Sequence, residues 1–139
     1  MKLLACYIEN FGMLHQIEYQ FDDGFNVIYD ENGSGKTTLA MFIRSMFYGF
    51  PKEKRINNDR KHYLPYNGLP CGGTLDFEID QKQYRIQRSF GKSYSSDHFI
   101  LFDLKTKLKR IKETEKLNKI HPFFQLFPFS NGYSVFMSI

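Results

Sequence analysis

The chain has 139 residues, of which 24% are charged and 17% aromatic, and its formal net charge is +4. This length is ordinary for one domain, and the aromatic residues supply material for a core. No run of about 18 apolar residues and no charged-then-apolar leader is present, so the sequence predicts no membrane span, no secretory signal and cytoplasmic residence. The two cysteines, Cys6 and Cys71, lack C-x-x-C spacing and a neighbouring histidine pair, which disfavours a metal site and a disulfide framework. We expect Cys6 to be a small core residue and Cys71 to be exposed and reactive.

Two amphipathic strands are predicted at the start of the chain, on either side of a turn at residues 10–13. Their apolar residues are Leu3, Ala5 and Tyr7 in the first strand and Leu14, Ile17, Tyr19 and Phe21 in the second. A turn at residues 22–24 then leads to the apolar run Phe25 to Tyr29, which predicts a buried strand.

A loop typical of phosphate binding follows that strand. The Walker A pattern G-x-x-x-x-G-K-[ST] fits residues 30–37 except at its first position, where the chain has Asp30. Gly33 and Gly35 allow the backbone to approach phosphates, Lys36 can contact the β and γ oxygens, and the Thr37 hydroxyl can bind Mg²⁺. The helix that follows directs its partial positive charge at the same anion. The alternative is an ordinary strand-to-helix turn with a surface lysine.

Asp30 places a carboxylate close to the predicted phosphate site. Aspartate is among the residues that best tolerate a left-handed backbone, so the loop can still form. We therefore expect weakened affinity for phosphate rather than loss of the loop.

The remaining segments read in order as a helix, a connector, a meander and a tail. Apolar residues recur at helical spacing from Leu39 to Phe47, and Gly49 followed by Pro51 predicts the end of that helix. Basic residues dominate a connector at 51–72. A meander at 73–104 contains three alternating strands, and a tail at 105–139 begins with partial helical periodicity; the expected segments are strands 74–79, 83–90 and 98–104, and a helix 105–120.

These segments resemble the amino-terminal lobe of YhaN-like AAA-family ATPases, which belong with the SbcC and SMC-type ATP-binding-cassette heads. Two blocks in the same order carry the resemblance: residues 1–12, 25–29, 31–32, 35–39 and 42–49, and then residues 60–66, 72–77 and 84–90. The resemblance covers about residues 1–104 and implies an α/β P-loop NTPase fold, with a mixed sheet and an antiparallel meander, in a single lobe over residues 1–139. Asp30 departs from the family loop, which has glycine there.

The resemblance also implies the ligands and the residues that bind them. The cofactors are ATP and Mg²⁺, with Lys36 at the triphosphate and Thr37 at the metal. The backbone contacts to phosphate come from Asn32, Gly33, Ser34, Gly35, Lys36, Thr37 and Thr38. The segment 10–12 falls where such heads pass near adenine, although Phe11 is equally explained as a core aromatic.

Heads of this family hydrolyse ATP only when a second lobe supplies an aspartate-glutamate pair, a signature serine loop and a switch histidine. The sequence contains no such pair after an apolar strand, and neither His98 nor His121 follows a strand as a phosphate sensor would. Ile139 stands about where the family has a metal-binding glutamine, and Gln125 fits that position poorly. We therefore expect a truncated head, connected with DNA repair or chromosome maintenance, that binds ATP without efficient hydrolysis. A complementary C-terminal lobe or a second copy would be its partner.

Two basic stretches, residues 52–61 and 105–119, could lie along a nucleic-acid backbone, although solvated surfaces are the commoner explanation. The connector is the better candidate for DNA because Tyr63 and Tyr66 could stack on bases. Two alternative functions remain. One is a nucleic-acid-binding module that does not use nucleotide, and the other is a nonfunctional fragment that exposes the phenylalanines of its tail.

Overall fold

The computed structural model describes residues 1–29, 31–50, 59–107 and 109–110. The strands are β1 (Lys2–Phe11), β2 (Leu14–Gln20), β3 (Cys71–Ile79), β4 (Lys82–Phe90), β5 (His98–Asp103) and β6 (Lys109–Arg110). The helices are α1 (Lys36–Tyr48), α2 (Asp59–Tyr63) and the 3-10 turn η1 (Tyr94–Ser96). No helix within these residues is long and apolar enough to cross a membrane.

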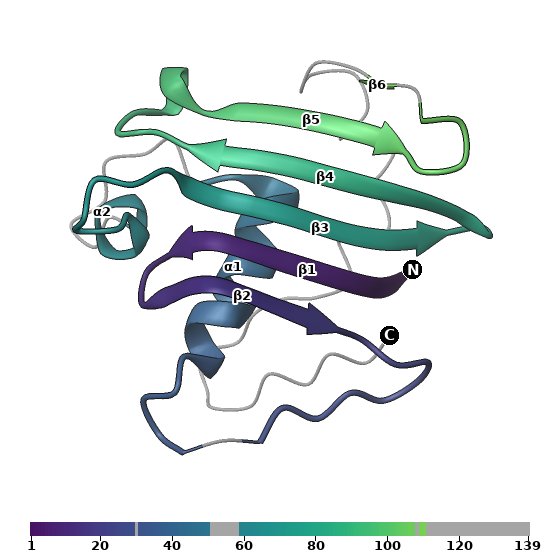
Figure 1. Ribbon diagram of the computed structural model, residues 1–139, viewed down its shortest axis with the longest axis horizontal. Coiled ribbons are helices and arrows are strands. Elements are labelled where there is room, and N and C mark those ends of the chain that lie inside the picture. The colour runs from purple at the N-terminus through teal and green to yellow at the C-terminus, as the bar shows by residue number, and fades with distance from the viewer. Residues whose placement is uncertain (30, 51–58, 108, 111–139) are drawn as a thin grey trace.

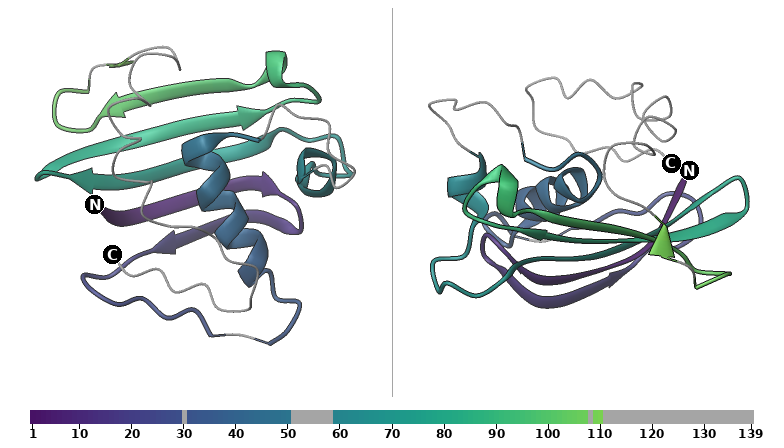
Figure 2. Two further views of the ribbon diagram at one scale, coloured as in Figure 1. Left: turned by 180° about the vertical axis from the view of Figure 1, so that it is seen from behind. Right: turned by 90° about the horizontal axis from the view of Figure 1, so that it is seen from above.

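Six strands form one sheet in the order β2-β1-β3-β4-β5-β6, and α1 crosses one face of it (Figures 1 and 2). The meander predicted from the sequence is confirmed as β3, β4 and β5. Every pairing among the described strands is antiparallel. The sheet expected from the family resemblance is mixed, which requires at least one parallel pair of strands. The described strands contain no parallel pair.

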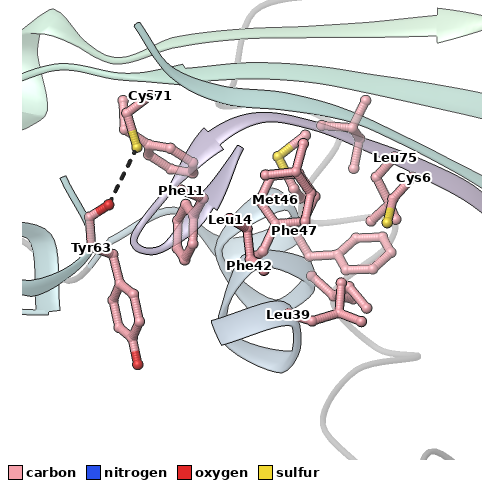
Figure 3. Packing of buried hydrophobic residues seen from close by; sticks show 14 of the residues in the cluster. Cys6, Phe11, Leu14, Leu39, Phe42, Met46, Phe47, Tyr63, Cys71 and Leu75 are labelled. Atoms are coloured by element: carbon pink, nitrogen blue, oxygen red, sulfur yellow. Dashed lines mark hydrogen bonds between the residues drawn. The ribbon is translucent and has the colours of Figure 1, made fainter. Parts of the chain in front are cut away.

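The core lies between α1 and the sheet, as the helical spacing predicted. The helix buries the apolar residues Leu39, Phe42, Ile43, Met46 and Phe47. They face the apolar side chains Cys6 and Leu75 of the sheet (Figure 3), and Phe77 and Ile86 belong to the same core cluster. The predicted helix end is confirmed too, because the Gly49 N–H donates to the Ser45 carbonyl at 2.8 Å and Gly49 has a positive φ of 72°.

The face that β1 presents to the core differs from the prediction. The pairing of β1 with β3 shifts register between Leu3 and Ala5, which marks a bulge. Because a bulge inserts one residue, it moves the following side chains to the opposite face. Cys6 and Ile8 are therefore buried, which confirms the prediction for Cys6, whereas Tyr7 is 40% exposed.

The segment Phe25 to Tyr29 is not the buried strand that its composition predicted. It forms no strand, and Val27 and Tyr29 are 69% and 95% exposed. The Asn26 side chain accepts from the Asp22 N–H at 2.8 Å and donates to the Asp22 carbonyl at 2.9 Å. This local loop takes the place of ladder pairing, since apolar residues form a buried strand only where a neighbouring strand is available.

Cys71 is buried at 2% exposure, so the prediction that it is exposed and reactive is wrong. It begins β3, pairs with Phe90 of β4, and directs its thiol at the Tyr63 carbonyl 3.8 Å away (Figure 3). Burial raises the pKa of the Cys71 thiol to about 12, which suppresses the reactive thiolate.

The start of the tail is also not helical where it is described. The Asp103 carboxylate accepts from the backbone N–H groups of Lys105 and Thr106 at 3.0 and 3.1 Å, which turns the chain. Lys109 and Arg110 then pair with β5 as β6. The rest of the predicted helix, together with His121, Gln125, Ile139 and the tail phenylalanines, lies outside the described residues.

Candidate functional site

The loop before α1 forms a tight turn. The Ser34 N–H donates to the Glu31 carbonyl at 3.2 Å, and Gly33 and Gly35 have φ angles of 89° and 100°. Gly35 is the N-cap of α1 and provides no side-chain hydrogen bond to the first turn. The 13-residue helix α1 therefore begins without a capping side chain, an arrangement that suits an anion.

Two polar side chains of this part of the chain, Ser34 and Lys36, bear on how it could bind an anion. The Lys36 ammonium donates to the Glu31 carbonyl at 2.7 Å and so folds back over the loop. The Ser34 hydroxyl is buried and has no hydrogen-bond partner. A buried hydroxyl without a partner is costly, and a phosphate oxygen in the loop would provide the missing acceptor. Thr37 is exposed at the same helix start, whereas Asp30 lies outside the described residues.

Close packing fixes where this loop lies on the sheet. A Cβ atom added at Gly35 would lie only 2.7 Å from Leu14 Cδ2, so the backbone of the loop rests directly on the start of β2. The glycine is thus required both for its left-handed backbone and for this close approach.

Phe11 is fully buried, which confirms its interpretation as a core aromatic. Its ring lies 5.0 Å from that of Tyr63 and 5.4 Å from that of Phe42, between α2 and α1 (Figure 3). The ring is therefore not available to stack on an adenine base, and the placement of segment 10–12 near adenine stays a prediction.

The profile of the family described as AAA domain matches residues 5–122. The chain belongs to the AAA domain family. The α/β P-loop NTPase fold and the resemblance to a YhaN-like AAA lobe, both expected from the sequence, are thereby confirmed.

Relatives of this AAA chain include three proteins with 31–34% identity. They are the uncharacterized protein YhaN of Bacillus subtilis (34% over 95 residues), the DNA double-strand break repair Rad50 ATPase of Methanosarcina acetivorans (32% over 100 residues), and the DNA replication and repair protein RecF of Shewanella loihica (31% over 90 residues). The matches cover 66%, 70% and 61% of the chain, respectively. The matched region spans only 9% of YhaN, 9% of Rad50 and 25% of RecF.

In the described part of the connector, Arg60 and Tyr63 do not belong to a solvated basic surface. Arg60 in α2 is 7% exposed, and its guanidinium makes two hydrogen bonds to the Asp97 carboxylate at 2.6 and 2.7 Å. Tyr63 is 9% exposed, so it is unavailable to stack on a base, whereas Tyr66 is 98% exposed. Lys52, Lys54 and Arg55 lie outside the described residues.

Sequence reasoning missed the buried pair of Arg60 and Asp97. Both residues come from polar stretches 37 positions apart, and no periodicity links them. A signal in the sequence was Gly91, which stands beside a serine-rich turn. The Gly91 N–H donates to the Asp97 carboxylate at 2.9 Å, and the Gly91 carbonyl accepts from the Arg60 guanidinium at 2.7 Å.

The described residues contain no cluster of three or more histidine, cysteine or acidic side chains that could hold a metal ion. His98 is exposed at the start of β5. Thr37 thus remains the metal-binding residue predicted from the sequence, as a single hydroxyl ligand of the kind that completes the coordination of a phosphate-bound Mg²⁺.

Proposed function

We propose that this lobe binds ATP with Mg²⁺ as part of an ATP-binding-cassette or SMC-type ATPase head connected with DNA repair. The observation that carries the proposal is the loop at the start of α1, where two left-handed glycines, an uncapped helix end and the partnerless Ser34 hydroxyl converge. The Rad50 and RecF relatives support the connection with DNA repair. Residence in the cytoplasm and a single lobe over residues 1–139 are parts of the same proposal.

Each residue of the loop has a chemical role in this proposal. The backbone N–H groups from Asn32 to Thr38, with Gly33, Ser34 and Gly35 between them, surround the phosphates. When ATP binds, the Lys36 ammonium gives up its hydrogen bond to the neutral Glu31 carbonyl. It donates instead to the charged oxygens of the β and γ phosphates, which form stronger hydrogen bonds. The Thr37 hydroxyl would hold Mg²⁺, which would neutralise negative charge on the phosphates.

We further propose that the lobe alone does not hydrolyse ATP efficiently. Phosphoryl transfer needs a positioned water and charge stabilisation at the γ-phosphate in addition to the phosphate loop. A complementary C-terminal lobe, or a second copy of this chain, would supply those groups. The solvent-exposed apolar segment Phe25 to Tyr29 supports an incomplete head, because such residues are normally covered by a partner.

Calorimetric titration with Mg²⁺ and a nonhydrolysable ATP analogue tests the proposal. The parent chain should bind, Lys36→Ala should abolish binding, and Asp30→Gly should strengthen it by removing a carboxylate near the phosphates. Lys92→Ala is the matched control, since it removes an exposed lysine from the β4–β5 connection and should bind like the parent. No binding by a folded Asp30→Gly chain would overturn the proposal.

A second candidate is a nucleic-acid-binding module independent of nucleotide. The observation in its favour is the nearly complete exposure of Tyr66, which follows the exposed Lys61 of α2 by five residues in the sequence. Single-stranded DNA binding that weakens with salt, is reduced by Tyr66→Ala and is unchanged by the ATP analogue would favour it. A broad, noncooperative unfolding transition would instead favour a nonfunctional fragment.

A further inference from the structure

The turn between β1 and β2 lies between the start of α1 and α2. The Gly12 N–H donates to the Tyr63 carbonyl at 2.7 Å, which ties the turn to α2. A Cβ atom added at Gly12 would lie 3.0 Å from Thr38 Cγ2 and 3.2 Å from Tyr63 Cδ1, so the same glycine also contacts the first turn of α1.

The phosphate loop rests on the same turn. The backbone at Gly35 packs on Leu14 and Met13, with added-Cβ distances of 2.7 and 3.7 Å, and Thr38 packs on Gly12. The turn therefore contacts the residues on both sides of Lys36 and Thr37. The position of the turn therefore determines where the Lys36 ammonium and the Thr37 hydroxyl lie.

Helix α2 is itself held in place by a buried ion pair. The side chains of Arg60 and Asp97 are 8% and 5% exposed, and Arg60 also donates to the Gly91 carbonyl at 2.7 Å. The guanidinium lies 5.1 Å from the centre of the Phe50 ring, just after the end of α1. A five-residue helix would be marginal alone, so these contacts determine its position.

We infer that Tyr63 is a positioning residue for the proposed nucleotide site, and that the Arg60–Asp97 pair holds Tyr63 against the β1–β2 turn. The stacking of Tyr63 on Phe11, with ring centres 5.0 Å apart, transmits this support to the core beneath α1. The inference rests on the proposed binding of ATP, but the positioning itself concerns the unliganded loop and is measurable without nucleotide.

The test compares Tyr63→Leu with Tyr84→Leu. Tyr84 also stacks on a buried phenylalanine, Phe77, with ring centres 5.7 Å apart, but it lies on β4 and not on the β1–β2 turn. Hydrogen exchange at the amides of residues 35–39 should be faster in Tyr63→Leu than in Tyr84→Leu at equal global stability, set with denaturant. Tyr63→Phe retains the ring and should restore the parent exchange rates.

Titration with Mg²⁺ and the ATP analogue is the second measurement. Tyr63→Leu should weaken binding about fivefold or more, while Tyr84→Leu and Tyr63→Phe should bind like the parent. Equal exchange rates in the two leucine variants would overturn the inference whether or not nucleotide binds. Absence of binding by the parent and by Asp30→Gly would overturn the proposed function, and the exchange rates would then decide the positioning role alone.

Discussion

Gly35 combines a backbone conformation and a packing position that other residues adopt only with strain. Its φ is 100°, and a side chain there would collide with Leu14. Gly35→Ala should therefore lower the free energy of unfolding by about 2 kcal/mol or more, as both costs add. Denaturant unfolding measures this loss in the free energy of unfolding, and Gly33→Ala is the control variant.

Gly33 has a similar φ of 89°, but among the described residues no atom beyond its chain neighbours lies within 4 Å of an added Cβ. Its replacement by alanine should cost only the backbone strain, about 1 kcal/mol. If the two variants lost equal stability, the contact of the loop with β2 would contribute nothing to folding.

The two cysteines give the free energy of unfolding a predictable dependence on pH. Burial raises the pKa of both thiols to about 12. In the unfolded chain they ionise near their ordinary pKa of about 8.5, so the unfolded state binds fewer protons between those values. The free energy of unfolding should thus be unaffected by the thiols below about pH 8 and should fall as the pH rises toward 12.

Denaturant unfolding at pH 8 and pH 10 checks this prediction. The parent should lose about 2–4 kcal/mol more between these pH values than the double variant Cys6→Ala, Cys71→Ala, because each thiol contributes up to about 2 kcal/mol over this range. The double variant controls for the lysines and tyrosines that titrate in the same range. An identical loss in both chains would contradict burial of the thiols.

At the scale of elements, the buried ion pair between Arg60 of α2 and Asp97, just before β5, attaches α2 to the sheet. Asp97→Asn keeps the shape of the side chain but leaves the Arg60 guanidinium without its counter-charge, so the free energy of unfolding should fall by about 3–5 kcal/mol. Asp76→Asn is the matched control. Asp76 also binds a guanidinium with two hydrogen bonds, but that arginine, Arg85, is 45% exposed, so the loss should be about 1 kcal/mol or less. Equal losses in the two variants would argue against the role of burial.

The elements that sequence periodicity could predict are those whose pattern is local. Helix α1 and the three strands of the meander follow from apolar spacing within each segment, and the glycines of the phosphate loop follow from their motif. The exposed face of β1 could not be predicted, because the bulge near Leu3 arises from pairing with β3, some 70 residues later. The burial of Arg60 likewise depends on Asp97 and is invisible within a run of basic residues. The segment Phe25 to Tyr29 has the composition of a buried strand, but whether it becomes one depends on a neighbouring strand.

At the scale of the whole molecule, the segment Phe25 to Tyr29 is an exposed apolar surface, within the part of the chain that the structure describes, that calls for a covering partner. Phe25, Val27 and Tyr29 are all at least 67% exposed. We expect concentration-dependent self-association through these side chains, because clustered apolar surface in contact with water favours association. Val27→Lys should weaken the association measured by sedimentation equilibrium, since it places a charge in the centre of the segment.

The same substitution distinguishes an exposed segment from a buried strand. Val27 is 69% exposed, so Val27→Lys should change the free energy of unfolding by no more than about 0.5 kcal/mol. Tyr66→Lys is the matched control: it removes an exposed aromatic residue outside the segment and should leave self-association unchanged. A loss of several kcal/mol in Val27→Lys would instead mean that Val27 is buried in the folded chain, because an unpaired charge is destabilising only where water is excluded. The apolar segment would then already be covered, and the lobe would need no partner at that surface.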